Sequence, residues 1–294
     1  MRRILDLSSH NGNEVTDWNA VKNSVDGVIL RVGYRGYGSG KLVADKKFAE
    51  FAQACKRVGL PFGVYFMSQA INEAEATEEA MYSVYKAQEY GATLPVFIDS
   101  EDGDGTAKVV RADGLSKAAR TKVAKAFCDT VNGLGCVAGV YASESWFTGR
   151  LNYEELTKYY IWVADYGKNT GVKNSTIALR KYDMHQYTSR ARISGINDGV
   201  DMSEMYTPVG VSGGTGNVNT EIKVNDEETY NMKTIKKGSK GTAVKIWQII
   251  VGVTPDGDFG TKTDRATREF QKAKGLTMDG IVGKNSWRAG LESV

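Results

Sequence analysis

Four carboxylates occupy positions from which their side chains could work together as acids and bases. Asp99 and Glu101 form an Asp-x-Glu pair at the end of the apolar run 94–101. Side chains two residues apart on a strand point to the same face, so we expect both at one mouth of a barrel. Asp6 and Asp201 also follow short apolar runs. One such acid alone is more simply explained as a residue that ends a strand or caps a helix. Acids at three separate strand ends together favour a catalytic role.

Acids gathered in this way could donate a proton to a glycosidic oxygen. Burial of several like charges raises the pKa of at least one carboxyl, which then acts as the acid while its neighbours stay ionised. The chain has two histidines, His10 and His185, and a zinc hydrolase is hard to build from so few; a structural role is simpler for each. The one Gly-x-Ser-x-Gly match, at residues 210–214, falls in a Gly-rich segment and not in a strand-to-helix elbow, and there is no Walker loop. We therefore expect a carboxylate enzyme with no metal and no cofactor.

Residues 1–207 alternate strand-like and helix-like segments, which is typical of parallel β/α units. We predict strands over residues 4–9, 27–34, 61–68, 94–101, 136–143, 160–166, 180–188 and 199–203. We predict helices around 17–24, 45–58, 73–90, 116–133 and 151–158, with Ser116 as a cap and Gly59 ending the second. Eight strands predict an α/β fold, an irregular TIM-like β/α barrel whose last three strands are joined by loops. Asp6 and Asp201 would then meet the Asp-x-Glu pair at the C-terminal ends of the strands.

Aromatic side chains in or just past these strands could stack on sugar rings, although each ring alone suits a core position equally well. Tyr65 and Trp162 are the strongest candidates for contact with substrate. The further candidates are Tyr34, Tyr141, Tyr166 and Tyr187.

The rest of the chain divides into a Gly-rich, acidic segment and a basic one. Residues 208–233 have the composition of a flexible linker. Residues 234–294 carry 11 Lys and Arg against 6 Asp and Glu, and segment 256–262 resembles segment 279–284. Apolar residues at helical spacing around both segments predict a small all-α domain of about three helices. Its positive charge favours an anionic partner, such as a wall polymer, nucleic acid or anionic lipid, or serves solubility alone.

The composition is that of a soluble globular protein, with 41% hydrophobic and 25% charged residues. No apolar run approaches the roughly 20 residues that cross a bilayer, so we expect no stable membrane insertion. The polar start predicts that no signal peptide directs export, and therefore synthesis in the cytoplasm. Three cysteines, Cys55, Cys128 and Cys136, fit buried thiols better than a disulfide framework.

Residues 1–207 resemble the glycoside hydrolase family 25 lysozymes. The matching segments, in family order, are LDLSSHNG at 5–12, GVYF at 63–66, IDSE at 98–101, IWVADY at 161–166, QYT at 186–188 and GVDMS at 199–203. The resemblance implies hydrolysis of the β-1,4 bond between N-acetylmuramic acid and N-acetylglucosamine. It makes Glu101 the general acid/base and Asp99 the group that orients the substrate's acetamido group. Asp6 and Asp201 would line the site and Gln186 would contact the substrate.

Two further features qualify or extend this resemblance. Met184-His185 stands where the family often has an aromatic residue, which puts sugar contacts on that side in question. Residues 234–294 resemble the helical peptidoglycan-binding module, with the segments KGSKG at 237–241, WQ at 247–248, DGDFG at 256–260, FQ at 270–271 and GLTMDGIVG at 275–283. The expected lack of a signal peptide fits a phage endolysin that accumulates in the host cytoplasm and reaches the wall once the membrane is breached. The two-module layout favours a Gram-positive wall as its target.

Other interpretations stay open. A bacterial autolysin would have the same activity, and a chitinase-type endo-glycosidase could use a similar barrel, although a single Asp-x-Glu does not match the usual chitinase pattern. A dead barrel would leave a non-catalytic wall-binding protein. Nucleic-acid binding by the basic module lacks any recognisable motif, so we expect none. The oligomeric state is not determined by the sequence.

Overall fold

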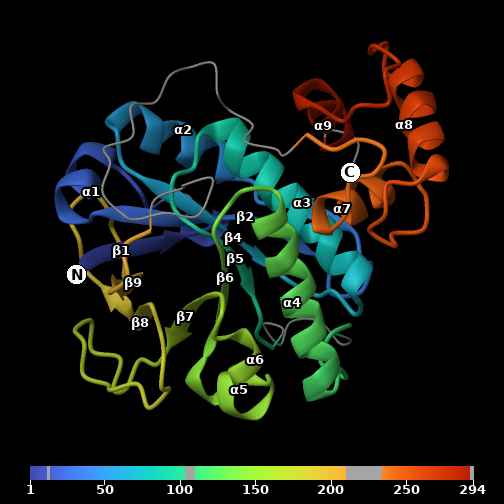
Figure 1. The fold of residues 1–294 in the computed structure, drawn as a ribbon. Helices are drawn as coiled ribbons and strands as arrows, with labels where there is room; N and C mark the ends of the chain where they lie inside the picture. The colour runs from blue at the N-terminus through green and yellow to red at the C-terminus, as the bar shows by residue number, and fades with distance from the viewer. Residues whose placement is uncertain (12–13, 103–109, 210–233, 292–294) are drawn as a thin grey trace.

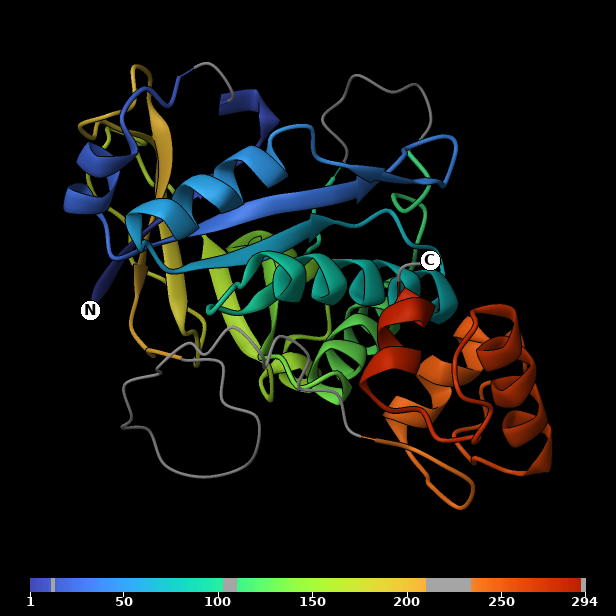
Figure 2. The same ribbon diagram turned by 90° about the horizontal axis from the view of Figure 1, so that it is seen from above.

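The computed structural model describes residues 1–11, 14–102, 110–209 and 234–291. Eight strands form a closed barrel in the order β1-β9-β8-β7-β6-β5-β4-β2, and pairing of β1 with β2 closes it (Figures 1 and 2). The strands are β1 Arg2–Leu7, β2 Gly27–Arg35, β4 Phe62–Met67, β5 Val96–Asp99, β6 Ala138–Ser143, β7 Tyr160–Ala164, β8 Met184–Ala191 and β9 Val200–Met205. The predicted irregular barrel is therefore confirmed. A short strand, β3 Leu42–Ala44, was not predicted and pairs with the end of β2.

The last strand departs from the parallel arrangement that the sequence predicted. The pairs from β1 through β2 and on to β8 are parallel, but β9 runs antiparallel to both β8 and β1. Only residues 192–199 join β8 to β9, which is shorter than the dozen or so residues a parallel crossover needs. Asp201 consequently lies near the start of its strand and not at a C-terminal end, yet the reversed direction brings it to the same mouth, opposite Asp6.

Helices cover the outside of the barrel (Figure 1). They are α1 Trp18–Ser24, α2 Phe48–Val58, α3 Glu73–Tyr90, α4 Lys117–Gly133, α5 Glu144–Gly149 and α6 Tyr153–Leu156. The Ser116 hydroxyl accepts a hydrogen bond from the amide of Ala119, which confirms the predicted cap of α4. Gly59 ends α2 in the left-handed conformation at φ 66°, as its place after the helix predicted.

Alternating side chains along the strands form two apolar cores. Outward residues such as Leu5 and Val64 pack against the helices, while inward residues such as Ile29, Phe97 and Trp162 fill the barrel. The barrel is thus solid below its mouth, and function is confined to the rim. Cys55 and Cys128 are buried and Cys136 is half-buried, and none forms a disulfide. Within the described ranges, no helix is both long and apolar enough to cross a membrane.

The C-terminal segment forms helices α7 Thr242–Ile250, α8 Thr261–Ala273 and α9 Lys284–Leu291. Its internal repeat has a structural basis in two buried glutamines. Gln248 donates to Asp256 and accepts from the amide of Gly257, and Gln271 makes the same bonds to Asp279 and Gly280. Each glutamine therefore closes one Asp-Gly turn, which explains why the repeat includes the residue pairs WQ and FQ.

The C-terminal helices pack against the barrel's outer helices α3 and α4, as both ribbon views show. Gly133, at the end of α4, lies so close to α7 that a Cβ there would stand 3.0 Å from the Thr242 methyl carbon. The α4 helix ends where the chain enters β6, at the end of the barrel opposite the mouth. The predicted linker 208–233 lies outside the described residues from 210 onward, and the predicted domain boundaries stay predictions.

Candidate active site

Seven polar side chains point inward at the mouth of the barrel, and we call them the mouth cluster. They are Asp6 on β1, Arg31 on β2, Tyr65 on β4, Asp99 on β5, Tyr141 on β6, Gln186 on β8 and Asp201 on β9. Their apolar neighbours in sequence face the outer helices: Leu5 and Leu7 flank Asp6, and Val200 and Met202 flank Asp201. The period of two along each strand therefore brings together residues far apart in the chain.

The predicted carboxylates meet at this mouth, and burial gives them perturbed proton affinities. Burial raises the pKa of Asp6 well above its ordinary value, and the charge of Asp201 adds to the effect. Burial and the charge of Glu101 likewise raise the pKa of Asp99, which is 3% exposed. Burial raises the pKa of Asp201 to about 6. Anions held this close together cannot all be ionised at neutral pH, so the cluster retains protons.

Glu101 is the carboxylate that opens onto a cavity. Burial first, and then the charges of Asp201 and Asp102, raise the pKa of Glu101 to about 7. It does not stand on the strand as the sequence predicted, because β5 ends at Asp99. The amide of Ser100 still donates to the Tyr141 carbonyl, at 2.9 Å, so the chain leaves the barrel only beyond that residue. Glu101 is therefore half-buried at the rim, where a carboxyl can exchange a proton with a bound molecule.

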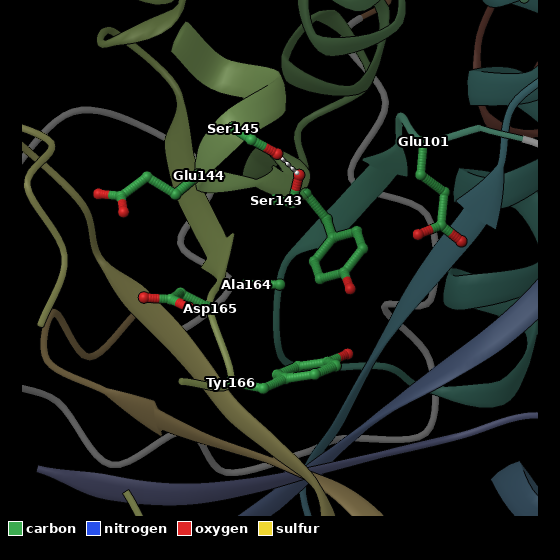
Figure 3. Close-up of a pocket in the computed structure, with 8 residues that line it drawn as sticks. Glu101, Ser143, Glu144, Ser145, Ala164, Asp165 and Tyr166 are labelled. Carbon is green, nitrogen blue, oxygen red and sulfur yellow. Dashed lines mark hydrogen bonds between the residues drawn. The ribbon is translucent and has the colours of Figure 1, made fainter. Parts of the chain in front are cut away.

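The cavity beside Glu101 has a volume of about 460 Å³. Its lining residues come from the ends of β6 and β7, from the start of α5, and from the segments that follow β5 and β7: Glu101, Tyr141, Ser143, Glu144, Ser145, Ala164, Asp165 and Tyr166. Figure 3 shows Glu101 across the cavity from Glu144 and Asp165. The size suits one or two sugar rings, and the polar lining offers hydroxyl and carboxylate groups to their hydroxyls.

A hydrogen-bonded chain links the cavity to the mouth cluster through Gln186. The hydroxyls of Tyr141 and Tyr166 both donate to Gln186 Oε1, at 2.7 and 2.8 Å. Gln186 Nε2 in turn donates to Asp6 Oδ2 at 2.9 Å. Gln186 is 2% exposed, so it positions the two tyrosines that line the cavity and has little surface left for contact with a ligand.

The other predicted aromatic contacts lie away from the cavity. Trp162 is 2% exposed. The centroid of its ring lies 4.5 Å from that of Tyr141 and 5.0 Å from that of Phe97, and its Nε1 donates to the hydroxyl of Ser203. It therefore forms the floor beneath the site and presents no open face for stacking. The ring centroid of Tyr65 lies 6.4 Å from that of Trp162. The roles of Tyr65 and of Tyr34, whose ring lies beside Arg31, as substrate contacts stay predictions.

Residues at the Met184-His185 position follow the strand's alternation. Met184 fills the barrel core, and His185 faces outward, with its Nε2 2.9 Å from the Asp165 carbonyl. The predicted structural role of His185 agrees with this placement. Where the family often has an aromatic residue, this chain has Met184, whose side chain packs in the barrel core.

Sequence reasoning missed several residues of the site. Ser143 ends the predicted strand 136–143, and Glu144 and Ser145 follow it; the signal that could have found them was this position at a strand's C-terminal end. Arg31 was also missed, although a charged residue inside the apolar run 27–34 was a signal of an inward-facing functional position.

A closed β/α barrel with a carboxylate cluster and an adjoining cavity at its mouth is an architecture of glycoside hydrolases. Comparison with known families identifies which one. The model of glycosyl hydrolases family 25 matches residues 5–196, and that of a peptidoglycan binding domain matches residues 247–289. The family match covers more than half of the chain, so the protein belongs to glycosyl hydrolases family 25 and carries a peptidoglycan-binding domain.

A curated relative matches nearly the whole chain, and solved structures match about 70% of it. An autolytic lysozyme of Clostridium acetobutylicum is 24% identical over 280 residues, which cover 95% of this chain and 76% of that protein. The structure of the modular autolysin LytC from Streptococcus pneumoniae in complex with synthetic peptidoglycan ligand has a TM-score of 0.59 at 29% identity. That match covers 69% of this chain and 46% of LytC, so the chain spans about half of that protein. The catalytic domain of endolysin ply40, from bacteriophage P40 of Listeria monocytogenes, has a TM-score of 0.57 at 25% identity and matches over 70% of this chain and 93% of that one.

Proposed function

We propose that this protein is a muramidase that hydrolyses the β-1,4 bond between N-acetylmuramic acid and N-acetylglucosamine in peptidoglycan. The observation that carries the proposal is Glu101, a half-buried carboxyl with a pKa of about 7 beside a cavity of sugar size. An acid with a pKa near neutrality is partly protonated at neutral pH and can deliver its proton to a leaving oxygen.

The neighbouring acids take the complementary roles. Asp99 lies deeper than Glu101 and would orient the substrate's acetamido group as it attacks the anomeric carbon, after which Glu101 removes a proton from the incoming water. Asp6 and Asp201 would line the site, tune its charge and hold the sugar. A carboxylate ester between Asp99 and the sugar in a trapped intermediate would contradict the substrate-assisted route.

The C-terminal domain would hold the enzyme on its polymeric substrate. Its family match and its excess of basic residues support binding to peptidoglycan, and the wall that we propose is Gram-positive. We propose that the whole chain is an endolysin that reaches the wall after release from the host cytoplasm, which the similarity to ply40 supports. The similarity to an autolytic lysozyme supports a bacterial autolysin equally. A holin gene beside the coding sequence would favour the endolysin, and a chromosomal gene free of phage genes would favour the autolysin.

The activity is tested on purified Gram-positive walls by turbidity loss and by analysis of new reducing ends. We expect wild type to release N-acetylmuramic acid reducing ends, and Glu101→Gln to release none. Glu89→Gln is the matched control, because Glu89 pairs with Lys86 on the outer helix α3, away from the mouth. Equal activity of Glu101→Gln and wild type would contradict the assignment of the acid. New reducing ends from chitin but not from walls would contradict the substrate.

A further inference from the structure

The segment that joins β7 to β8 contains a residue in an unusual backbone conformation. The segment begins with Asp165 and Tyr166, which line the cavity. Among the described residues, Asn169 is the one non-glycine residue with a positive φ, at 48°. Asparagine tolerates this left-handed conformation better than most residues do, but it keeps the conformation only where surrounding contacts hold it. Such conformations cluster at functional sites, where they set the position of a neighbouring group.

The side chain of Asn169 is anchored to strand β8. The pairing of β7 with β8 ends at Gln186, and the Asn169 side chain lies beside β8 just beyond that point. Its Oδ1 accepts from the hydroxyl of Thr188 at 2.7 Å and from the amide of Ser189 at 3.0 Å. Its Nδ2 donates to the hydroxyl of Ser189 at 2.9 Å. Asn169 thus bonds to β8 as a neighbouring strand would, and three hydrogen bonds fix its place.

The backbone of Asn169 in turn holds Tyr166. The amide of Asn169 donates to the carbonyl of Tyr166 at 2.7 Å, which closes a four-residue turn. At the far end of the tyrosine side chain, the hydroxyl donates to Gln186 Oε1 at 2.8 Å. Tyr166 is therefore tied to β8 twice, at its hydroxyl through Gln186 and at its backbone through Asn169.

The ring of Tyr166 offers the cavity an aromatic surface. Figure 3 shows this ring extending from beside Asp165 towards Glu101. Tyr141, the other aromatic residue of the lining, is 9% exposed and packs against Trp162. Tyr166 is half-buried, so more of its ring stays open to the cavity. A sugar ring that enters the cavity can stack its apolar face on this surface.

We propose that Asn169 is a positioning residue for substrate binding: anchored on β8, it holds the Tyr166 ring as the wall on which a sugar stacks beside Glu101. This inference rests on the proposed function, because a sugar is the ligand that the proposed function assigns to the cavity. Asn169 itself touches neither the acid nor the cleaved bond. Its loss should therefore weaken the binding of substrate and leave proton transfer intact.

The test compares KM and kcat on soluble peptidoglycan fragments for variants of the full chain. Asn169→Gly keeps the left-handed backbone, which glycine adopts freely, and deletes the side chain. Asn169→Asp keeps acceptor oxygens for Thr188 and Ser189 and loses only the donor. Thr188→Val breaks the same link from β8 and replaces Asn169→Gly if that variant does not fold. The matched control is Asn132→Ala, because Asn132 Oδ1 also accepts from a strand amide, that of Ala138 at 3.1 Å, at the opposite end of the barrel.

We expect Asn169→Gly to raise KM at least about threefold and to change kcat less than about twofold, because stacking stabilises bound substrate and transition state alike. The KM of Asn169→Asp should lie nearer that of wild type. Asn132→Ala should leave KM unchanged, because a general loss of stability does not alter the cavity.

A double-variant cycle shows whether Asn169 acts through Tyr166. Tyr166→Ala removes the ring, so addition of Asn169→Gly should raise KM no further, whereas independent effects would multiply. Multiplied effects would overturn the inference, as would an equal rise of KM in Asn132→Ala. An unchanged KM in Asn169→Gly, or in Thr188→Val where it replaces that variant, would overturn it too. Release of no reducing ends by wild type would instead contradict the proposed function.

Discussion

Replacement of Glu101 by glutamine should abolish activity and at the same time make the protein more stable at alkaline pH. Glu101 has its pKa raised from the ordinary 4.5 to about 7, mainly by burial and next by the charges of Asp201 and Asp102. Between these two values the folded state binds a proton that the unfolded chain has released. The free energy of unfolding therefore falls as pH rises from about 4.5 to about 7, and the full loss persists above that range.

The magnitude follows from the same two values. A tenfold change in proton affinity corresponds to about 1.4 kcal/mol, so the ionised Glu101 costs the fold about 3 kcal/mol above pH 7. Glutamine has nearly the same shape and never ionises. Glu101→Gln should thus raise the free energy of unfolding by up to about 3 kcal/mol at pH 8 and leave it nearly unchanged at pH 4.

Urea unfolding of the full chain at pH 4, 6 and 8 measures this difference. Glu89→Gln loses only a half-exposed ion pair and should change the free energy of unfolding by less than about 0.5 kcal/mol at pH 6 and pH 8. A Glu101→Gln difference that does not grow with pH would refute the idea that burial destabilises this carboxylate. The assignment of Glu101 as the acid would then depend on the activity measurement alone.

Three further changes test the packing around the site and between the domains. Trp162→Phe loses the hydrogen bond to Ser203 in a fully packed floor, so the free energy of unfolding, measured by thermal unfolding, should fall by about 1–3 kcal/mol. The affinity for a soluble fragment, measured by calorimetry, should change less than twofold. Gln248→Ala leaves the groups bonded to its side chain without hydrogen-bond partners. We expect the amount of protein that sediments with walls to fall at least tenfold while hydrolysis of soluble fragments persists. Unchanged sedimentation would contradict the role of the turn. Gly133→Leu should force α7 away from α4 and increase the radius of gyration in small-angle scattering, whereas Gly149→Leu, with open space around it, should leave it unchanged.

Local sequence signals determined much of this protein. The Asp-x-Glu pair, the cap at Ser116 and the glycine after α2 depend on contacts within a few residues, so their chemistry is readable without a fold. The alternation along each strand also follows from local pattern. It places Asp6 and Asp99 at the C-terminal ends of their strands, as observed, whereas Asp201 reaches the same mouth from the start of the reversed strand β9.

Only the tertiary structure decided how these parts combine. The direction of β9 depends on the length of the connection before it and on the partner strands available, which no single segment contains. Trp162 reads as a rim aromatic in sequence but lies in the floor, because burial depends on the rings packed around it. Gln186 donates a hydrogen bond to Asp6, which is 180 positions away in the chain, and such a contact exists only once the barrel closes.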